Sequence, residues 1–358
     1  MKNETVTHRP PLAALTFAVA SALASALLNG QQAPTRRTDQ QADTFRFQSG
    51  VDLVNVSVTV SDTRGRFVPD LTEDDFRVFD DGQLQSIAYF NAERVPISLG
   101  LVLDTSRSMV GDKIRSAQSA LDHLLLDLLG PGDEVFLFTF SDTPVLLQTW
   151  TTDPALVSRA LGRLSPHGAT ALYDAVARAL PLALGGAHRK KALLIISDGN
   201  DTSSDTPLTG LRQRIRESEL LVYAIGIDGE RDDQFRRPPP RGPQPRFPRP
   251  YPPPRGRGWW PQINGLGQPR FPGLGGDQRV NVAALRDLTD ESGGRTEVIR
   301  DARDLDPATA GIADELGRQY FLSYPATTTR DGRWHAIKVE VASGPYRVRA
   351  RAGYVAGP

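Results

Sequence analysis

Three short segments of this 358-residue chain carry side-chain oxygens that could bind a metal ion. The first holds Asp104, Ser106 and Ser108 in a D-x-S-x-S sequence directly after an apolar run. Thr170 stands just before a predicted helix, and Asp198 follows a second apolar run. Carboxylate and hydroxyl oxygens are hard ligands suited to Mg²⁺ or Mn²⁺. These residues predict a divalent-cation site if the fold brings the three segments together.

Each segment taken alone has a commoner explanation. Ser and Asp after a strand usually cap the next helix, and an Asp-Gly pair such as Asp198-Gly199 usually forms a turn. The three segments occur together, however, each at the end of a predicted strand or the start of a predicted helix. This combination favours the metal site over helix capping.

The sequence lacks the motifs of several enzyme classes. It has no Cys, which excludes thiolate catalysis, disulfides and zinc–thiolate sites, and it has no G-x-S-x-G, H-E-x-x-H or P-loop sequence. Its five His are scattered. His167 lies three residues before Thr170, where it either lines the predicted site or is a solvent-exposed loop residue. We expect no catalytic residues.

The predicted ligands belong to an α/β pattern. Continuous apolar runs, typical of parallel strands covered on both faces, occupy residues 97–103, 135–140, 192–196 and 220–227. Shorter strands are expected at 145–150 and 296–299. Helical spacing predicts helices at 113–129, 153–163, 171–185, 281–292 and 306–318. The alternation predicts an α/β fold with a doubly wound, mostly parallel, Rossmann-like sheet, in which ligands bind beyond the carboxyl ends of the strands.

Further β segments flank this pattern. Alternating apolar residues predict a strand over 54–60, and Asp81-Gly82 predicts a hairpin turn between strands at 76–79 and 84–90. After the last helix, three more strands are expected at 320–324, 335–341 and 346–352. The N-terminal β segment is small for an independent domain. We therefore expect the N- and C-terminal segments to form one shared β-sandwich.

The amino terminus predicts a targeting segment. Lys2 and Arg9 precede an alanine-rich apolar run over 12–28, the pattern of a secretory signal. The run has 17 residues and is marginal for a membrane-spanning helix, so an uncleaved single-pass anchor is the alternative. We expect a bacterial protein that is secreted or periplasmic, with cleavage near residues 30–33.

The basic residues are concentrated in one tract. The chain has 42 Lys and Arg against 42 Asp and Glu, which gives no reason to expect nucleic acid as a partner. Residues 229–279, however, hold ten Arg and 13 Pro, a composition that excludes regular helix or sheet. Because the α/β pattern resumes afterwards, we expect an insertion within the domain. It is either a contact arm beside the metal site or a surface loop without a function.

The predicted metal ligands resemble the metal-ion-dependent adhesion site of von Willebrand factor type A (VWA) domains. All five positions of that motif are matched, by Asp104, Ser106, Ser108, Thr170 and Asp198. The resemblance covers about 95–325 and implies that the Ser and Thr residues ligate the ion directly and the Asp residues directly or through water. A partner's carboxylate would fill the open position. Arg107, where many members have Gly, and the 229–279 insertion depart from the family pattern.

The flanking segments are similar to a bacterial VWA-related family described from Acidobacteria. Val68–Phe76 and Arg349–Tyr354 carry this similarity. We expect five parts: a signal peptide (1–30), a disordered spacer (31–44), an N-terminal β unit (45–95), the VWA domain (96–325) and a C-terminal β segment (326–358).

The resemblance implies an exported binding protein rather than an enzyme. It would capture a protein ligand that presents an acidic side chain, through Mg²⁺ or Mn²⁺, and would contact a membrane only if the signal stays uncleaved. Two alternatives remain. One is a metal-dependent hydrolase, for which His167 is the sole nearby candidate base. The other is a structural module of a cell-envelope assembly in which the metal site is vestigial.

Overall fold

The computed structural model describes residues 52–198, 201–228, 281–326, 331–342 and 344–356. The predicted signal peptide, spacer and proline-rich insertion lie outside these residues. Within the described ranges, no helix combines the length and the apolar character needed to cross a membrane.

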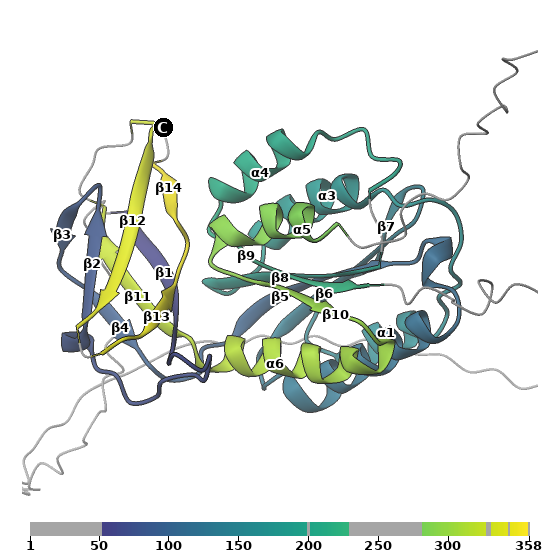
Figure 1. Cartoon of the computed structure of the whole chain (residues 1–358), viewed down its shortest axis with the longest axis horizontal. Helices are drawn as coiled ribbons and strands as arrows, with labels where there is room; N and C mark the ends of the chain where they lie inside the picture. The colour runs from purple at the N-terminus through teal and green to yellow at the C-terminus, as the bar shows by residue number, and fades with distance from the viewer. Residues whose placement is uncertain (1–51, 199–200, 229–280, 327–330, 343, 357–358) are drawn as a thin grey trace, which may run out of the picture. The chain divides into compact units, whose positions relative to one another are not determined.

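A six-stranded sheet forms the centre of the α/β part (Figure 1). Its strands are β5 (Ile97–Asp104), β6 (Glu134–Phe140), β7 (Pro144–Thr151), β8 (Lys190–Ser197), β9 (Leu221–Ile227) and β10 (Thr296–Ile299). The order is β10-β9-β8-β5-β6-β7, and all neighbours are parallel except β6 and β7. β5 is buried along its whole length, as its continuous apolar run predicts.

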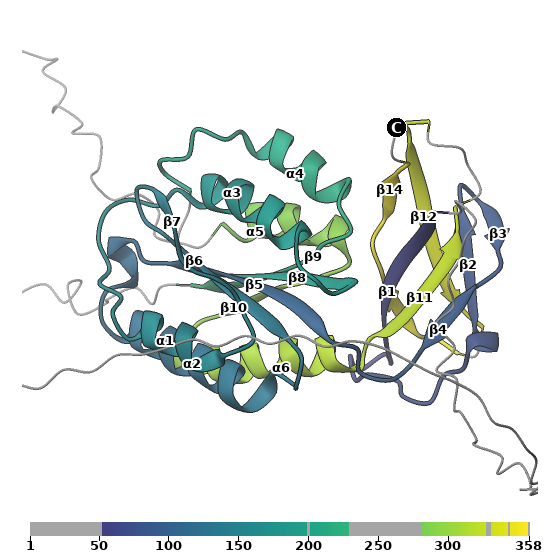
Figure 2. The same cartoon turned by 180° about the vertical axis from the view of Figure 1, so that it is seen from behind.

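Helices cover both faces of this sheet (Figures 1 and 2). They are α1 (Asp112–His123), α2 (Pro154–Leu161), α3 (Leu172–Leu184), α4 (Leu208–Arg216), α5 (Val282–Thr289) and α6 (Leu305–Arg318). One apolar core lies between the sheet and α1, α2 and α6, and the other between the sheet and α3, α4 and α5. Leu101 and Val102 of β5 belong to opposite cores, which is the alternation of a strand buried on both faces. The predicted doubly wound α/β class is confirmed.

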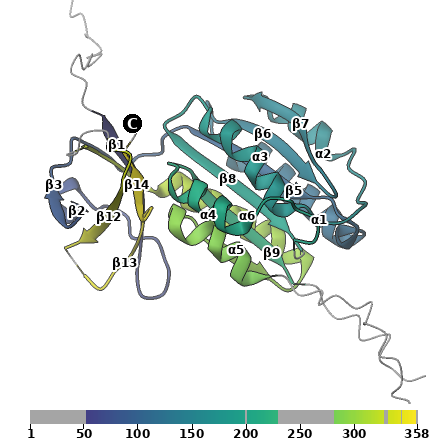
Figure 3. The ribbon, with the colours of Figure 1, turned by 90° about the horizontal axis from the view of Figure 1, so that it is seen from above.

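Two antiparallel sheets form a β-sandwich from the two flanking segments (Figure 3). Their orders are β13-β1-β11-β4 and β14-β12-β2-β3, so each combines strands from before and after the α/β part. The strands are β1 (Leu53–Ser61), β2 (Phe76–Asp80), β3 (Gln83–Gln85), β4 (Tyr89–Asn91), β11 (Tyr320–Pro325), β12 (Trp334–Val341), β13 (Arg347–Arg349) and β14 (Gly353–Val355). Val56, Val78, Tyr320 and Ile337 are buried in one core between the sheets. The expected shared sandwich is confirmed.

Several details differ from the sequence predictions. The single strand expected at 84–90 is wrong: β3 pairs with β2, whereas β4 pairs with β11 in the opposite sheet. The strand expected at 346–352 is too long: β13 covers only Arg347–Arg349, and β14, in the other sheet, begins after the predicted span. Helix α4 is absent from the predictions, because only Leu211 and Ile215 of its nine residues are buried. β11 falls within the span predicted for the α/β domain, yet it pairs with β1 and β4.

Glu315 of α6 joins the α/β part to the sandwich. Its Oε1 accepts hydrogen bonds from the hydroxyls of Tyr223 in β9 at 2.8 Å and Thr59 in β1 at 3.3 Å, and from the guanidinium of Arg349 in β13. Its Oε2 accepts a hydrogen bond from Nε of Arg295 at 2.9 Å. Only 11% of the Glu315 side chain is exposed, so its two cationic partners offset the cost of burying the carboxylate.

Candidate metal site

Asp104 lies at the carboxyl end of β5. Its Oδ1 accepts a hydrogen bond from the backbone N–H of Ser106 at 2.8 Å, and its Oδ2 accepts one from the hydroxyl of Ser197 at 2.6 Å. Ser197 ends β8, which runs parallel beside β5, so the two loops leave the sheet at the same edge. Burial raises the pKa of Asp104 to about 6; the hydrogen bonds from both serines oppose this rise, and the Asp198 carboxylate adds to it.

Ser106, Ser108 and Asp198 form a continuous set of side-chain oxygens. Ser106 Oγ lies 2.9 Å from Ser108 Oγ, and Ser108 Oγ donates a hydrogen bond to Asp198 Oδ1 at 2.6 Å. Ser106 precedes the short 3-10 helix Arg107–Met109, yet its side chain makes no capping hydrogen bond. The capping explanation is therefore wrong for Ser106, whose hydroxyl instead faces the other predicted ligands.

The loop that carries Thr170 packs against the D-x-S-x-S loop through backbone hydrogen bonds. The N–H of Arg107 donates to the carbonyl of Gly168 at 3.2 Å, and the N–H of His167 donates to the carbonyl of Thr105 at 2.8 Å. Thr170 is itself buried. The third predicted segment is thus held beside the first.

Gly168 is required for this close approach. Its φ of +73° lies in the left-handed region, and a Cβ added there would lie 1.9 Å from Asp142 Oδ2. Asp142 Oδ1 in turn accepts a hydrogen bond from the N–H of Ala169 at 2.8 Å. Thr170 does not cap the following helix, because the N-cap residue of α3 is Ala171.

His167 is exposed on this loop. Its Nε2 lies 3.4 Å from Ser141 Oγ, and its Nδ1 lies 2.9 Å from the carbonyl oxygen of Ser165. Neighbouring loop residues therefore hold the ring, which agrees with the surface-loop alternative.

The donor set fits a hard divalent cation. Two carboxylates and three hydroxyls come from three loops that meet at one edge of the sheet, and these are the oxygen ligands that Mg²⁺ and Mn²⁺ prefer. Side-chain contacts join Ser106, Ser108 and Asp198, whereas Asp104 is connected through a backbone N–H and Thr170 through its loop. These five residues would hold an ion here.

Sequence reasoning missed two groups that contact the predicted ligands. Lys113, in the first turn of α1, donates a hydrogen bond from its ammonium group to Asp198 Oδ2 and forms an ion pair with it. Ser197 donates its hydroxyl to Asp104. Both lie beside recognised motifs, Lys113 five residues after Ser108 and Ser197 directly before Asp198, and that proximity was the available signal.

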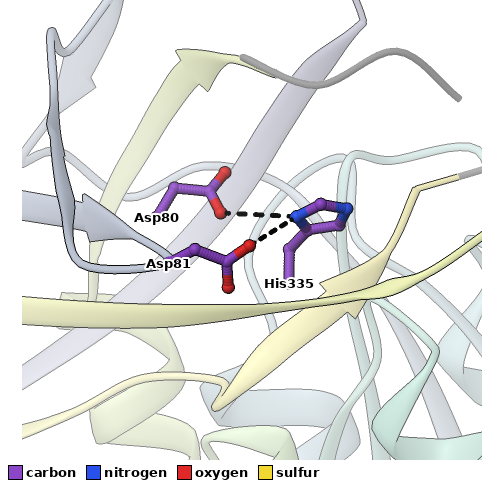
Figure 4. Close-up of side chains that lie close together, drawn as sticks. All are labelled: Asp80, Asp81 and His335. Atoms are coloured by element: carbon purple, nitrogen blue, oxygen red, sulfur yellow. Dashed lines mark hydrogen bonds and ion pairs between the residues drawn. The ribbon is translucent and has the colours of Figure 1, made fainter. Parts of the chain in front are cut away.

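A second group of ligand-type side chains lies within the sandwich. Asp80, Asp81 and His335 each offer a ligand atom within 4.8 Å of the others (Figure 4). His335 Nδ1 lies 2.8 Å from Asp81 Oδ2 and 4.0 Å from Asp80 Oδ1, and its Nε2 lies 3.2 Å from Asp331 Oδ1. Burial lowers the pKa of His335, but the carboxylates of Asp331 and Asp81, which accept hydrogen bonds from the ring, outweigh this and raise the pKa overall. These contacts account for the cluster without an ion.

Sequence comparison relates part of the α/β region to a known family. Residues 99–200 match the family model described as von Willebrand factor type A domain. Inter-alpha-trypsin inhibitor heavy chain H2 of Homo sapiens is 23% identical over 163 residues, which are 40% of this chain and 17% of that protein. The Mus musculus protein is 24% identical over 165 residues, with the same coverage. The match therefore spans less than a fifth of the length of these relatives.

Solved structures with weak similarity include VWA proteins. The von Willebrand factor type A protein from Catenulispora acidiphila is 14% identical, with 86% of this chain and 73% of that chain covered and a TM-score of 0.44. Proximal thread matrix protein 1 from the mussel byssus, with a zinc-occupied MIDAS motif, is 13% identical, with 66% of this chain and 49% of that chain covered and a TM-score of 0.44. All five predicted ligands fall within the residues that the family model matches. Residues 99–200 of the α/β part therefore match a von Willebrand factor type A domain.

Proposed function

We propose that this VWA domain binds Mg²⁺ or Mn²⁺ through Asp104, Ser106, Ser108, Thr170 and Asp198 and captures a protein partner through that ion. A carboxylate of the partner would complete the coordination of the cation. No covalent bond would be made or broken, so the protein would act as an adhesion-type binding module.

The arrangement of the serine hydroxyls is the observation that carries this proposal. Ser106 and Ser108 lie in a loop that precedes a helix, where hydroxyls commonly cap backbone N–H groups. Here Ser106 makes no such bond, and the Ser108 hydroxyl donates to the buried Asp198 from a different loop. A cluster of hydroxyl and carboxylate oxygens at the carboxyl end of parallel strands is suited to a hard cation.

Two other functions have weaker support. A metal-dependent hydrolase needs a base near the ion, and His167 is the candidate for that role. His167 is exposed, and its ring contacts Ser141 and the backbone carbonyl of Ser165. VWA domains are typically interaction modules rather than enzymes. A structural module of a cell-envelope assembly would not require the five ligand-type residues that this chain retains.

We further propose that the protein works outside the cytoplasm, secreted or in the periplasm of a bacterium. The support is the basic and then apolar pattern at residues 1–30. The partner would be a protein with an acidic side chain rather than a nucleic acid, because positive and negative side chains are equal in number.

The proposed function can be tested by thermal unfolding in EDTA and in millimolar Mg²⁺ or Mn²⁺. A ligand that binds only the folded state stabilises it by about 2.7 kcal/mol at a hundredfold excess over its dissociation constant, which corresponds to a melting-temperature rise of roughly 5–10 °C for a domain of this size. Asp104→Ala should abolish the shift. Asp153→Ala, which removes the cap of α2, should lower stability but keep the shift. No metal-induced shift in the wild-type protein would contradict the proposal.

A further inference from the structure

Lys113 places a positive charge inside the candidate metal site. Its ammonium group donates a hydrogen bond to Oδ2 of Asp198, while Oδ1 of the same carboxylate accepts a hydrogen bond from Ser108. The Asp198 side chain has no exposed surface, whereas 26% of the Lys113 side chain is exposed. The positive charge thus reaches the site from α1, on a lysine side chain that is still partly exposed to solvent.

This charge stabilises the site when no metal is bound. Asp104 and Asp198 are both buried, and a buried carboxylate without a cationic partner costs several kcal/mol. In the part of the chain that the structure describes, the ion pair with Lys113 is the one that either carboxylate makes with a Lys or Arg. Among the described residues, removing the ammonium group would leave Asp198 with the Ser108 hydroxyl as its side-chain donor.

The same charge opposes a divalent cation. A metal ion bound by Asp198 would share this carboxylate with an ammonium group of like sign, and repulsion between close charges is strong where water is excluded. An ion could therefore bind tightly only if the ammonium group moved away.

The Lys113 side chain has a place to move to. It also lines an open pocket of about 700 Å³ beside α1. Asp228 lines that pocket, as do Asp112 and Asp301, which already pair with Arg115 and Arg303. A lysine side chain is long and flexible, so the ammonium group can leave Asp198 for this open pocket without movement of the backbone.

We infer that Lys113 is a tethered counter-ion of the metal site: it neutralises Asp198 in the metal-free protein, leaves for the adjacent pocket when a divalent cation binds, and thereby weakens the affinity for that cation. This inference rests on the proposed function, because it assumes that the site binds metal. It adds a residue outside the five ligands that sets the cation concentration at which the site fills.

Lys113→Met tests the inference, because it keeps most of the aliphatic stem and removes the charge. Isothermal titration calorimetry with Mg²⁺ and with Mn²⁺ gives the dissociation constants, and thermal unfolding in EDTA gives the stability of the metal-free protein. We expect the variant to bind each ion about tenfold more tightly or better and to melt at a lower temperature in EDTA. At saturating metal concentration, the difference in melting temperature between the wild type and Lys113→Met should become smaller.

Three variants serve as controls. Arg115→Met removes a positive charge from the same helix and the same pocket, but Arg115 pairs with Asp112 and does not touch Asp198; its affinity should stay near that of the wild type. Lys113→Arg keeps the charge and should also bind with near-wild-type affinity. Lys113→Gln retains a donor for Asp198, and it should bind metal more tightly than the wild type even if the Met variant does not fold.

The outcomes separate the two proposals. Suppose that the wild type binds metal and that the folded variants Lys113→Met and Lys113→Gln bind it equally well or more weakly. That result would overturn the counter-ion role and leave the proposed function intact. Equal gains in affinity from Arg115→Met and Lys113→Met would also overturn it, since the effect would then be one of overall charge. An absence of metal binding by every one of these proteins would overturn the proposed function, and the inference with it.

Discussion

Lys190 is a buried cation whose protonation should govern stability in mildly alkaline solution. It lies at the start of β8 with 3% of its surface exposed, and its ammonium group donates to the backbone carbonyl of Leu316 near the end of α6. The pKa of Lys190 is lowered to about 7, mainly by burial and also by the positive charge of Arg94. The carboxylates of Glu315 and Asp133 oppose this shift only in part.

The sign and size of the effect follow from linkage between protonation and folding. In the unfolded chain a lysine has a pKa of about 10.4, so between pH 7 and 10 the unfolded chain holds a proton that the folded protein has lost. The contribution of Lys190 to the free energy of unfolding is therefore fully present above about pH 10.4 and is lost as the pH falls towards 7. From pH 7.5 to pH 9 it should grow by about 2 kcal/mol.

The variant Lys190→Met isolates this contribution. It preserves most of the buried stem and costs the hydrogen bond to the Leu316 carbonyl, about 1 kcal/mol at any pH. Urea unfolding of both proteins at pH 7.5 and pH 9 gives two free energies each, and the difference between the proteins cancels the other titrating groups. The wild type should gain about 2 kcal/mol on the variant between these pH values.

The refuting result is equally clear. If the difference in unfolding free energy between wild type and Lys190→Met changes by less than about 0.5 kcal/mol, Lys190 does not titrate in this range and the burial argument is wrong. Lys191→Met, which removes the adjacent and less buried lysine, is the control for the loss of one charge at this point of the chain.

Three further predictions concern other described contacts. Glu315→Ala removes the carboxylate between two arginines and should lower the free energy of unfolding by about 3–5 kcal/mol in urea titrations; a loss below about 1 kcal/mol would contradict its linking role. The pKa of His335 is raised in the folded protein, so the stability that its charged ring contributes is complete below about pH 6.5 and is lost as the pH rises through the folded pKa. The free energy of unfolding of the wild type should therefore fall relative to that of His335→Gln between pH 6 and 8. Parallel pH profiles of the two free energies would argue against the Asp81 contact. Gly168→Ala adds a Cβ against Asp142 at a positive φ and should cost about 1–3 kcal/mol in thermal unfolding while reducing the stabilisation by Mg²⁺; an unchanged protein would show that the loop adapts.

The parallel sheet was predictable because its strands are buried on both faces. A run such as Ile97–Leu103 has no polar alternation, and the next polar residue, Asp104, marks both the end of the strand and the first predicted ligand. The loops that hold the ligands follow such runs directly. Strand ends and ligand loops could therefore be located together.

The sandwich was harder to predict in detail. The alternation from Val54 to Val60 shows that one face of β1 is buried, but it does not show which strands lie beside it. The neighbours of β1 are β11 and β13, which follow the whole α/β part in the sequence. Pairing at such a distance leaves no local pattern, and the same reason explains why the division of residues 84–90 between two sheets was missed.

Contacts between charged side chains in the site were not predictable either. Lys113 and Asp198 are 85 residues apart, and helical spacing gives no indication of where the ammonium group points. The acidic cluster around His335 could not be predicted for the same reason, since Asp81 and His335 are far apart in the sequence. Sequence motifs identified the candidate ligand residues, whereas only the folded structure shows that Lys113 pairs with the carboxylate of Asp198.

The mixed composition of the sandwich sheets also limits when the sandwich can close during synthesis. Thr59 of β1 is hydrogen-bonded to Gln319, which directly precedes β11 and lies 260 residues later. During synthesis β1 and β2 emerge before β11, β12 and β13, so the edges that pair with these later strands stay open while the α/β part is made. Unpaired edges invite pairing with other chains, and contacts this distant in sequence form slowly. We therefore expect the sandwich to close late in folding, and its open strand edges to favour aggregation before that step.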